Sequence, residues 1–345
     1  MIRADLANLP AYVPGKRAEN AIKLSSNETL QPPLPSAVEA MQTAAAGANR
    51  YPDMGAIELR TALAEHLGLT LDNVAVGTGS SALCQQLVQI TCTAADEIVF
   101  PWRSFEAYPL FAQVVGAKPV AVPLDDNHGV DLKAMAAAIT EHTRLVFVCN
   151  PNNPTGTTVT TAEFQEFLAA VPADVIVALD EAYFEYNRAT DTPVATDFLD
   201  SHPNVVGLRT FSKAYSLAGV RVGYAFGSAE IIGALNKVAI PFSVSAVAQA
   251  GALASLHAQD ELSERIETTI EQRARVVESL ADHGALPSEA NFIWLPADAV
   301  SALGTPQEIA ANLAEKGVLV RAFPEGVRIT ITTQEESDAL LKAWG

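Results

Sequence analysis

The stretch Arg209–Tyr224, RTFSKAYSLAGVRVGY, follows the apolar run 205–208 and places one lysine, Lys213, among small and hydroxylated residues. Arg221 lies further along the same stretch. A lysine in this setting is either an ordinary solvated surface charge or a buried amine that is kept for covalent chemistry. The segments on either side of it decide between these two interpretations.

Short apolar runs rich in β-branched residues alternate along the chain with alanine-rich amphipathic stretches. Continuous apolar strands in this arrangement are typical of a mainly parallel sheet that helices cover on both faces. The fold class is therefore α/β. The predicted strands are 74–76, 98–100, 120–122, 145–148, 175–179, 205–208 and 222–226, and the predicted helices include 80–91, 132–139 and 162–170.

The pattern changes after about residue 236. A long helical stretch, 261–282, precedes predicted strands at 291–295, 317–321 and 327–332 and a final helix, which is typical of an α+β domain. The segment through Pro35 is rich in proline and glycine and is predicted to be extended. We expect an N-terminal arm over 1–28 that joins the small domain, a large domain over 29–235 and a small domain over 236–345.

The composition excludes several classes of protein. A formal net charge of −18 over 345 residues opposes binding to nucleic acid or anionic membranes. The three cysteines form no CxxC pair and the histidines have no metal-ligand spacing, so we expect neither a disulfide framework nor a metal site. The first residues lack the apolar core of a signal peptide, and no apolar run reaches the roughly 18 residues of a membrane span. These features predict a soluble, cytoplasmic protein.

Polar clusters follow several of the predicted strands. Ligands of open α/β sheets bind beyond the carboxyl ends of the strands, so these clusters are expected to converge on one site. They are GTGSSA at 77–82, CNPNNPTG at 149–156, DEAY at 180–183 and the stretch that contains Lys213.

The first cluster, 77–82, also matches the G-x-G-x-x-A pattern of dinucleotide-binding folds, with Glu97 about 20 residues further on. In those folds the acidic residue ends the second strand, whereas Glu97 precedes a predicted strand. A nicotinamide cofactor would also leave Lys213 and Asp180 without a shared purpose. What remains is an anion site, because backbone amides at a helix N-terminus and two serine hydroxyls suit one phosphate group.

A phosphate site, a lysine and an aspartate at a strand end together predict pyridoxal 5′-phosphate. This cofactor needs a lysine to hold its aldehyde as a Schiff base, a carboxylate for its pyridine nitrogen, donors for its ring oxygen and a cup for its phosphate. In that order the candidates are Lys213, Asp180, the pair Asn153 and Tyr183, and the cup Ser80, Ser81, Ser212 and Arg221. Arg328, which interrupts an apolar run of the second domain, could hold a substrate anion bidentately.

Over essentially its whole length the chain resembles the fold type I, pyridoxal-phosphate-dependent aminotransferases of classes I and II. The resemblance implies a large domain with a mainly parallel seven-stranded sheet between helices, and a smaller α+β domain. The order and wording of the motifs are most similar to the histidinol-phosphate aminotransferase branch. Within that branch, PWRSFEAY and the short chain resemble the aromatic amino acid (phenylalanine) aminotransferases of actinobacteria. The motifs are YVPGK, LSSNE, NRYPD, VGTGS, CNPNNPTG, DEAY, RTFSKAYSLAGVRVGY, NF and VRITI.

The resemblance also implies roles for individual residues. Lys213, Asp180 and Tyr183 would be catalytic. Tyr51 would reach the cofactor phosphate of the other subunit, which implies a homodimer with shared active sites. The implied cofactor-binding residues are Gly79, Ser80, Ser81, Phe105, Asn153, Asp180, Tyr183, Thr210, Ser212, Lys213, Arg221 and Tyr51, with Phe105 stacked on the ring. The implied substrate-binding residues are Tyr12, Asn27, Asn153, Arg328 and Asn291.

The expected reaction is transamination of phenylalanine or tyrosine with 2-oxoglutarate as amino acceptor. Many histidinol-phosphate enzymes carry acidic residues where this chain has Ser81 and Ala82, and many stack a tyrosine where it has Phe105. A phosphate substrate should also want more cationic partners than the sequence shows near the site, whereas Phe105, Tyr12 and Tyr108 would suit an aromatic ring. The alternatives left open are a histidinol-phosphate aminotransferase and a pyridoxal-phosphate-dependent decarboxylase or lyase.

Overall fold

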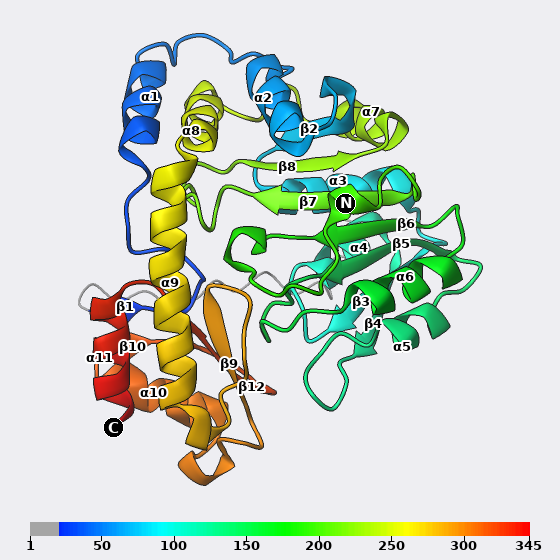
Figure 1. Ribbon diagram of the computed structural model, residues 1–345. Coiled ribbons are helices and arrows are strands. Elements are labelled where there is room, and N and C mark those ends of the chain that lie inside the picture. Colours follow the sequence, from blue (N-terminus) through cyan, green and yellow to red (C-terminus); the bar gives the residue numbers. More distant parts are fainter. Residues whose placement is uncertain (1–20) are drawn as a thin grey trace, which may run out of the picture.

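The computed structural model describes residues 21–345. Tyr12 lies outside the described residues. The centre of the molecule is a seven-stranded sheet with the strand order β2-β8-β7-β6-β5-β3-β4, in which β8 runs opposite to the other six strands (Figure 1). The mainly parallel α/β sheet predicted from the sequence is therefore confirmed. Its strands are β2 Val74–Gly77, β3 Glu97–Trp102, β4 Lys118–Pro123, β5 Thr143–Cys149, β6 Ile176–Asp180, β7 Val205–Thr210 and β8 Gly223–Gly227.

The alternating side chains of these strands build two apolar layers. On one face Val146 and Val177 pack with helices α5 (Leu132–Ala137) and α6 (Thr161–Ala170). On the other face Phe147 and Ala178 pack with helices α3 (Ser80–Thr91), α4 (Tyr108–Val115) and α7 (Ala229–Val238). Because both faces are covered, β7 and β8 are buried along their whole length, and most of their residues are apolar.

The C-terminal part forms two further sheets. Strands β11 (Arg321–Phe323), β12 (Gly326–Thr330) and β9 (Phe292–Pro296) pair antiparallel, and β1 (Ile22–Lys23) pairs parallel with β10 (Val318–Leu319). The single strand predicted at 317–321 is wrong in this respect. It divides into β10 and β11, which belong to different sheets. Helices α10 (Pro306–Glu315) and α11 (Gln334–Trp344) lie beside these strands (Figure 1).

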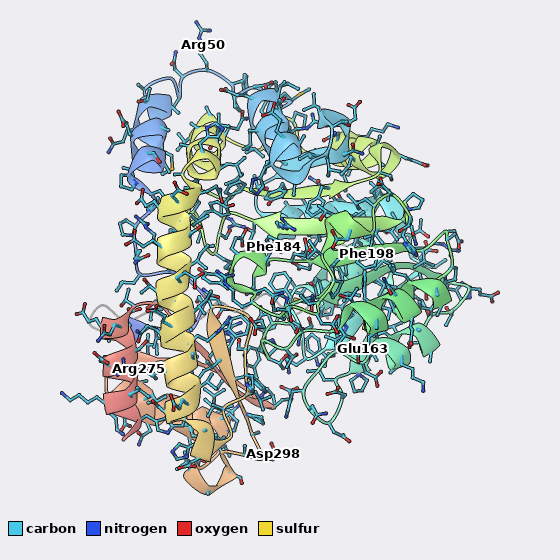
Figure 2. All side chains as sticks on the ribbon, viewed as in Figure 1. Arg50, Glu163, Phe184, Phe198, Arg275 and Asp298 are labelled. Carbon is cyan, nitrogen blue, oxygen red and sulfur yellow. The ribbon has the colours of Figure 1, made fainter. Side chains whose placement is uncertain are left out.

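One long helix, α9 (Gln259–Ser279), runs from the α1–α8 pair at one end of the molecule to the β9–β12 sheet at the other (Figure 1). Helix α1 (Pro35–Ala45) packs on α8 (Ala246–His257), with α2 (Ile57–Leu67) also against α8. Figure 2 shows Arg275 near the far end of α9, on the side of α11, where it pairs with Asp338.

The two ends of α9 contribute to different apolar cores. Leu262 and Ile266 join the core beneath the large sheet, whereas Val276 belongs to the core of the C-terminal sheets. We therefore propose that the boundary between the two domains lies within α9, and not at residue 236 as the sequence pattern predicted. The pairing of β1 with β10 supports the proposal that the N-terminal arm joins the small domain.

Candidate active site

The candidate site is a cavity of about 540 Å³ at the carboxyl edge of the large sheet. The order of strands reverses between β3 and β5, which are parallel neighbours: after β3 the chain continues outward to β4, and after β5 it continues in the other direction to β6. Open α/β sheets bind ligands beyond the strand ends at such a point. The strand ends here carry Phe105, Asn153, Asp180 and Lys213, and each of these residues lines the cavity.

At one end of the cavity the backbone forms a cradle for an anion. Helix α3 begins after Gly79 without a side-chain cap, so its first amides are available to a ligand. Gly79 has a φ of 81°, and a Cβ there would lie 2.2 Å from Nη2 of Arg221. Arg221 also donates from Nη1 to Oγ of Ser212 at 3.1 Å. Glycine is thus required for the guanidinium to approach the helix N-terminus, and the arrangement fits one phosphate group.

Lys213 follows β7 and points into the same cavity. Its Nζ lies 3.3 Å from the carbonyl oxygen of Asn27 and 3.4 Å from that of Ser26. Burial, followed by the charge of Arg328, lowers the pKa of Lys213 from its ordinary value to about 8. The structure thus excludes the solvated surface charge and leaves an amine that loses its proton readily, as a nucleophile or base requires.

Asp180, the last residue of β6, is buried at the floor of the cavity. Its Oδ2 accepts a hydrogen bond from the Tyr108 hydroxyl at 2.7 Å, and its Oδ1 accepts from the Ala182 amide at 3.2 Å. Burial raises the pKa of Asp180 to about 6, although both hydrogen bonds act in the opposite direction. A buried carboxylate of this kind suits a cationic ring nitrogen, because the attraction between the two charges would compensate for the hydration that the carboxylate has lost.

The N-terminal arm brings a further polar group over the cavity. Nδ2 of Asn27 donates to the Tyr183 hydroxyl at 2.9 Å, while the Asn27 amide donates to Oγ1 of Thr330 at 2.9 Å. Asn27 adopts a φ of 55°, a left-handed conformation that asparagine tolerates better than most residues. Burial raises the pKa of Tyr183, so its hydroxyl remains a donor at neutral pH.

Arg328 enters the cavity from β12 and is 7% exposed. Its Nη1 donates to Oδ1 of Asn153 at 2.5 Å and its Nη2 donates to the carbonyl oxygen of Ser25 at 2.8 Å. The guanidinium is therefore oriented from both sides. A fixed planar fork of this kind binds a carboxylate bidentately.

Most of the residues predicted from the sequence meet in this cavity. Those that line it are Asn27, Ser80, Ser81, Phe105, Asn153, Asp180, Tyr183, Thr210, Ser212, Lys213, Arg221 and Arg328. Gly79 lies directly beneath Arg221.

Two further predicted residues, besides Gly79, do not line the cavity. Asn291 is completely buried behind it, where Nδ2 donates to the Asn27 carbonyl at 3.2 Å. Tyr51 is 82% exposed and stacks on Phe242, with ring centroids 4.6 Å apart. Figure 2 shows its neighbour Arg50 projecting outward from the loop between α1 and α2. Tyr51 therefore takes no part in the cavity of its own chain.

Two expectations about the cavity need correction. Tyr108 is not an aromatic wall: it is fully buried, stacks on Phe147 and uses its hydroxyl on Asp180. The view that few cations lie near the site is also wrong, since Arg321 lines the cavity and pairs with Glu106. The register of β11 against β12, which places Arg321 opposite Arg328, is the signal that the sequence pattern did not reveal.

Within residues 21–345, no helix is both long and apolar enough to cross a membrane. The same part of the chain holds no group of three or more His, Cys, Asp or Glu side chains arranged to bind a metal.

A family model described as aminotransferase class I and II matches residues 19–343. The chain belongs to this family. The aminotransferase is 64% identical over 344 residues to a Corynebacterium glutamicum (strain R) protein named aromatic amino acid aminotransferase, covering 100% of this chain and 98% of that one. A Corynebacterium diphtheriae protein with the same name is 67% identical over 345 residues, with the same coverage.

Among solved structures, the aminotransferase resembles a histidinol-phosphate aminotransferase from Sinorhizobium meliloti in complex with pyridoxal-5′-phosphate. The TM-score is 0.89 at 30% identity, and the match covers 99% of this chain and 96% of that one. The likeness extends over both the large sheet and the C-terminal sheets.

Proposed function

We propose that this aminotransferase exchanges amino groups between aromatic amino acids, phenylalanine and tyrosine, and 2-oxoglutarate, with pyridoxal 5′-phosphate as cofactor. The observation that carries the proposal is the identity of 64–67% over the whole chain with relatives named aromatic amino acid aminotransferase. The aromatic lining of the cavity, from Phe105, Phe111 and Phe323, agrees with it, because such walls favour an uncharged ring.

The chain's own residues have distinct roles in this proposal. When bound, the cofactor supplies an aldehyde for the amino group and an electron sink for the bonds at Cα. Arg221 and the first turn of α3 would hold its phosphate, and Asp180 its ring nitrogen. Asn153 and Tyr183 would donate to its ring oxygen. Lys213, whose amine is readily neutral, would anchor the cofactor and then move the proton at Cα of the substrate.

The substrate would lie on the Arg328 side of the cavity. The guanidinium of Arg328 would hold the α-carboxylate and thereby aim the Cα–H bond at the amine of Lys213. Membership of the aminotransferase family favours amino transfer over decarboxylation or a lyase reaction. Histidinol-phosphate aminotransferase activity remains the second candidate, since a solved neighbour at 30% identity carries that name.

The direct assay supplies phenylalanine and 2-oxoglutarate to the reconstituted enzyme. The expected products are phenylpyruvate and glutamate in equal amounts, with no carbon dioxide released. Release of carbon dioxide, or turnover that needs no 2-oxo acid, would contradict amino transfer.

We also propose a cytoplasmic homodimer. Tyr51, Met54 and Ile240 are exposed apolar side chains, and a monomer would leave them in water. The cysteines of the described residues are all buried and unbridged, which agrees with a reducing compartment. The net charge of −18 disfavours nucleic acid as a partner. In the dimer, Tyr51 would reach the partner's phosphate cradle.

Mixing two defective variants tests the shared site. If Tyr51 serves the partner's cavity, Lys213→Ala and Tyr51→Phe chains should exchange to give heterodimers with one intact cavity, so that activity rises above that of either variant alone. Activity after subunit exchange, compared with unmixed controls, is the measurement. A monomer at working concentration with full activity would refute the shared site.

A further inference from the structure

Two arginines lie side by side at the substrate end of the cavity. Arg321 and Arg328 are direct partners in the antiparallel pair β11–β12, so their side chains leave the same face of the sheet. Their guanidinium carbons lie 5.5 Å and 5.7 Å from the ring centroid of Phe323, which also faces the cavity. A substrate whose α-carboxylate is on Arg328 therefore extends its side chain into the neighbourhood of Arg321.

The two guanidiniums have different partners. Nη1 of Arg328 donates to the amide oxygen of Asn153, and its Nη2 donates to the backbone carbonyl of Ser25. Arg321 instead donates from Nη2 to Oε2 of Glu106 at 2.9 Å, and Glu106 lines the same cavity. Arg321 thus faces the cavity paired with a carboxylate that faces the same cavity.

We propose that Glu106 is a specificity-determining residue that masks Arg321 from the distal group of the substrate. This inference rests on the proposed function, in which Arg328 holds the α-carboxylate. An aromatic side chain brings no charge and packs beside the neutral pair. A distal carboxylate or phosphate meets the Glu106 carboxylate as well as Arg321, and like charges at short distance oppose its binding.

The pair disfavours a distal anion without excluding it. The side chains of Arg321 and Glu106 are 18% and 31% exposed, so water screens their attraction and Glu106 can turn outward. The acceptor 2-oxoglutarate, which has a distal carboxylate, would bind by displacing Glu106 from Arg321. Glu106 thus adjusts the balance between aromatic and acidic substrates.

A second ion pair supplies a matched control. Arg103 forms two hydrogen bonds with Glu325, at 3.0 Å and 2.8 Å, and this pair also connects the segment after β3 with the β11–β12 hairpin. Neither residue lines the cavity. Glu325→Gln should therefore remove a similar bridge between the two domains without changing the charge that faces the substrate.

The test measures single turnovers of the half-reaction with phenylalanine and with glutamate. The specificity constants for the two donors are compared in wild type, Glu106→Gln and Glu325→Gln. We expect Glu106→Gln to shift the ratio at least tenfold toward glutamate, with Glu325→Gln keeping the wild-type ratio. If the bridge between Glu106 and Arg321 had only a structural role, each variant would lose the same factor in the specificity constant for both donors. That result would overturn the proposal. If wild type fails to react with phenylalanine, the proposed function itself is wrong.

Binding without turnover gives an independent readout. Glutarate, a dicarboxylate, should bind Glu106→Gln at least tenfold more tightly than wild type by calorimetry, while 3-phenylpropionate should gain far less. Arg321→Gln, which removes the masked cation, should weaken glutarate relative to 3-phenylpropionate. Equal changes for the two ligands in both variants would contradict the masking role, even if one variant were poorly active.

Discussion

Lys213→Ala is expected to lose transamination by about four orders of magnitude or more, the scale of losing both a nucleophile and a positioned base. The reason is that the amine of Lys213 lies in the cavity and its pKa is lowered to about 8, so it can act there as nucleophile and base. No other lysine lines that cavity among the described residues. The measurement is the rate of the half-reaction with phenylalanine, which needs no acceptor.

Covalent labelling separates a chemical defect from a folding defect. Borohydride treatment of wild type should fix the cofactor on the peptide that contains Lys213, as mass spectrometry would show, and the variant should carry no label. Lys237→Ala, on the exposed side of α7, is the matched control and should keep both label and activity. Label on another lysine in Lys213→Ala would mean that the anchor has been misassigned.

Asp180→Asn should lower kcat by roughly a hundred- to a thousandfold, the usual scale for losing one electrostatic partner of the reacting group. An amide has nearly the shape of the carboxylate but cannot balance a cationic ring nitrogen. Without ligand the effect should be opposite in sign, because the buried carboxylate is destabilising when ionised. Apo Asp180→Asn should therefore be more stable than wild type at neutral pH, by up to about 3 kcal/mol.

The pH dependence of apoenzyme stability checks this assignment. The folded-state pKa of Asp180, about 6, lies above the roughly 3.9 of an unfolded chain. Its protonation thus favours the folded state at low pH, and that contribution is lost as pH rises from about 4 through 6. Tyr108→Phe removes a hydrogen bond that stabilises the carboxylate, so the loss of folded-state stability as pH rises from about 4 through 6 should be larger in this variant than in wild type. If the two variants and wild type share one pH profile of unfolding, Asp180 is not the titrating group.

Much of the fold was predictable because its strands are buried on both faces. The runs that became β5 and β7 are continuous and apolar, which a strand with one solvated face would not be. Helix α3 was predicted with the bounds that it has, because Gly77 to Gly79 interrupt the strand pattern before it. The motifs after these strands then converged for the reason expected, since parallel strands end at one edge of the sheet.

The remaining features depend on tertiary contacts that local patterns do not encode. Whether Tyr108 faces a substrate or Asp180 is decided by the packing of α4 against β5, where Tyr108 stacks on Phe147. The division of 317–321 follows from two different partners, β1 for Val318 and β12 for Arg321. That division is also what aims Arg321 into the cavity, so its place in the site could not be read from sequence spacing.

We propose that the cavity is built for an aromatic amino acid. The most direct test is kcat/KM for phenylalanine and for histidinol phosphate, each measured with 2-oxoglutarate, because this ratio defines specificity. Phenylalanine is expected to be the better donor, since Arg328 receives its carboxylate and the masked Arg321 offers little to a phosphate. A preference for histidinol phosphate of tenfold or more, about 1.4 kcal/mol in transition-state binding, would contradict it.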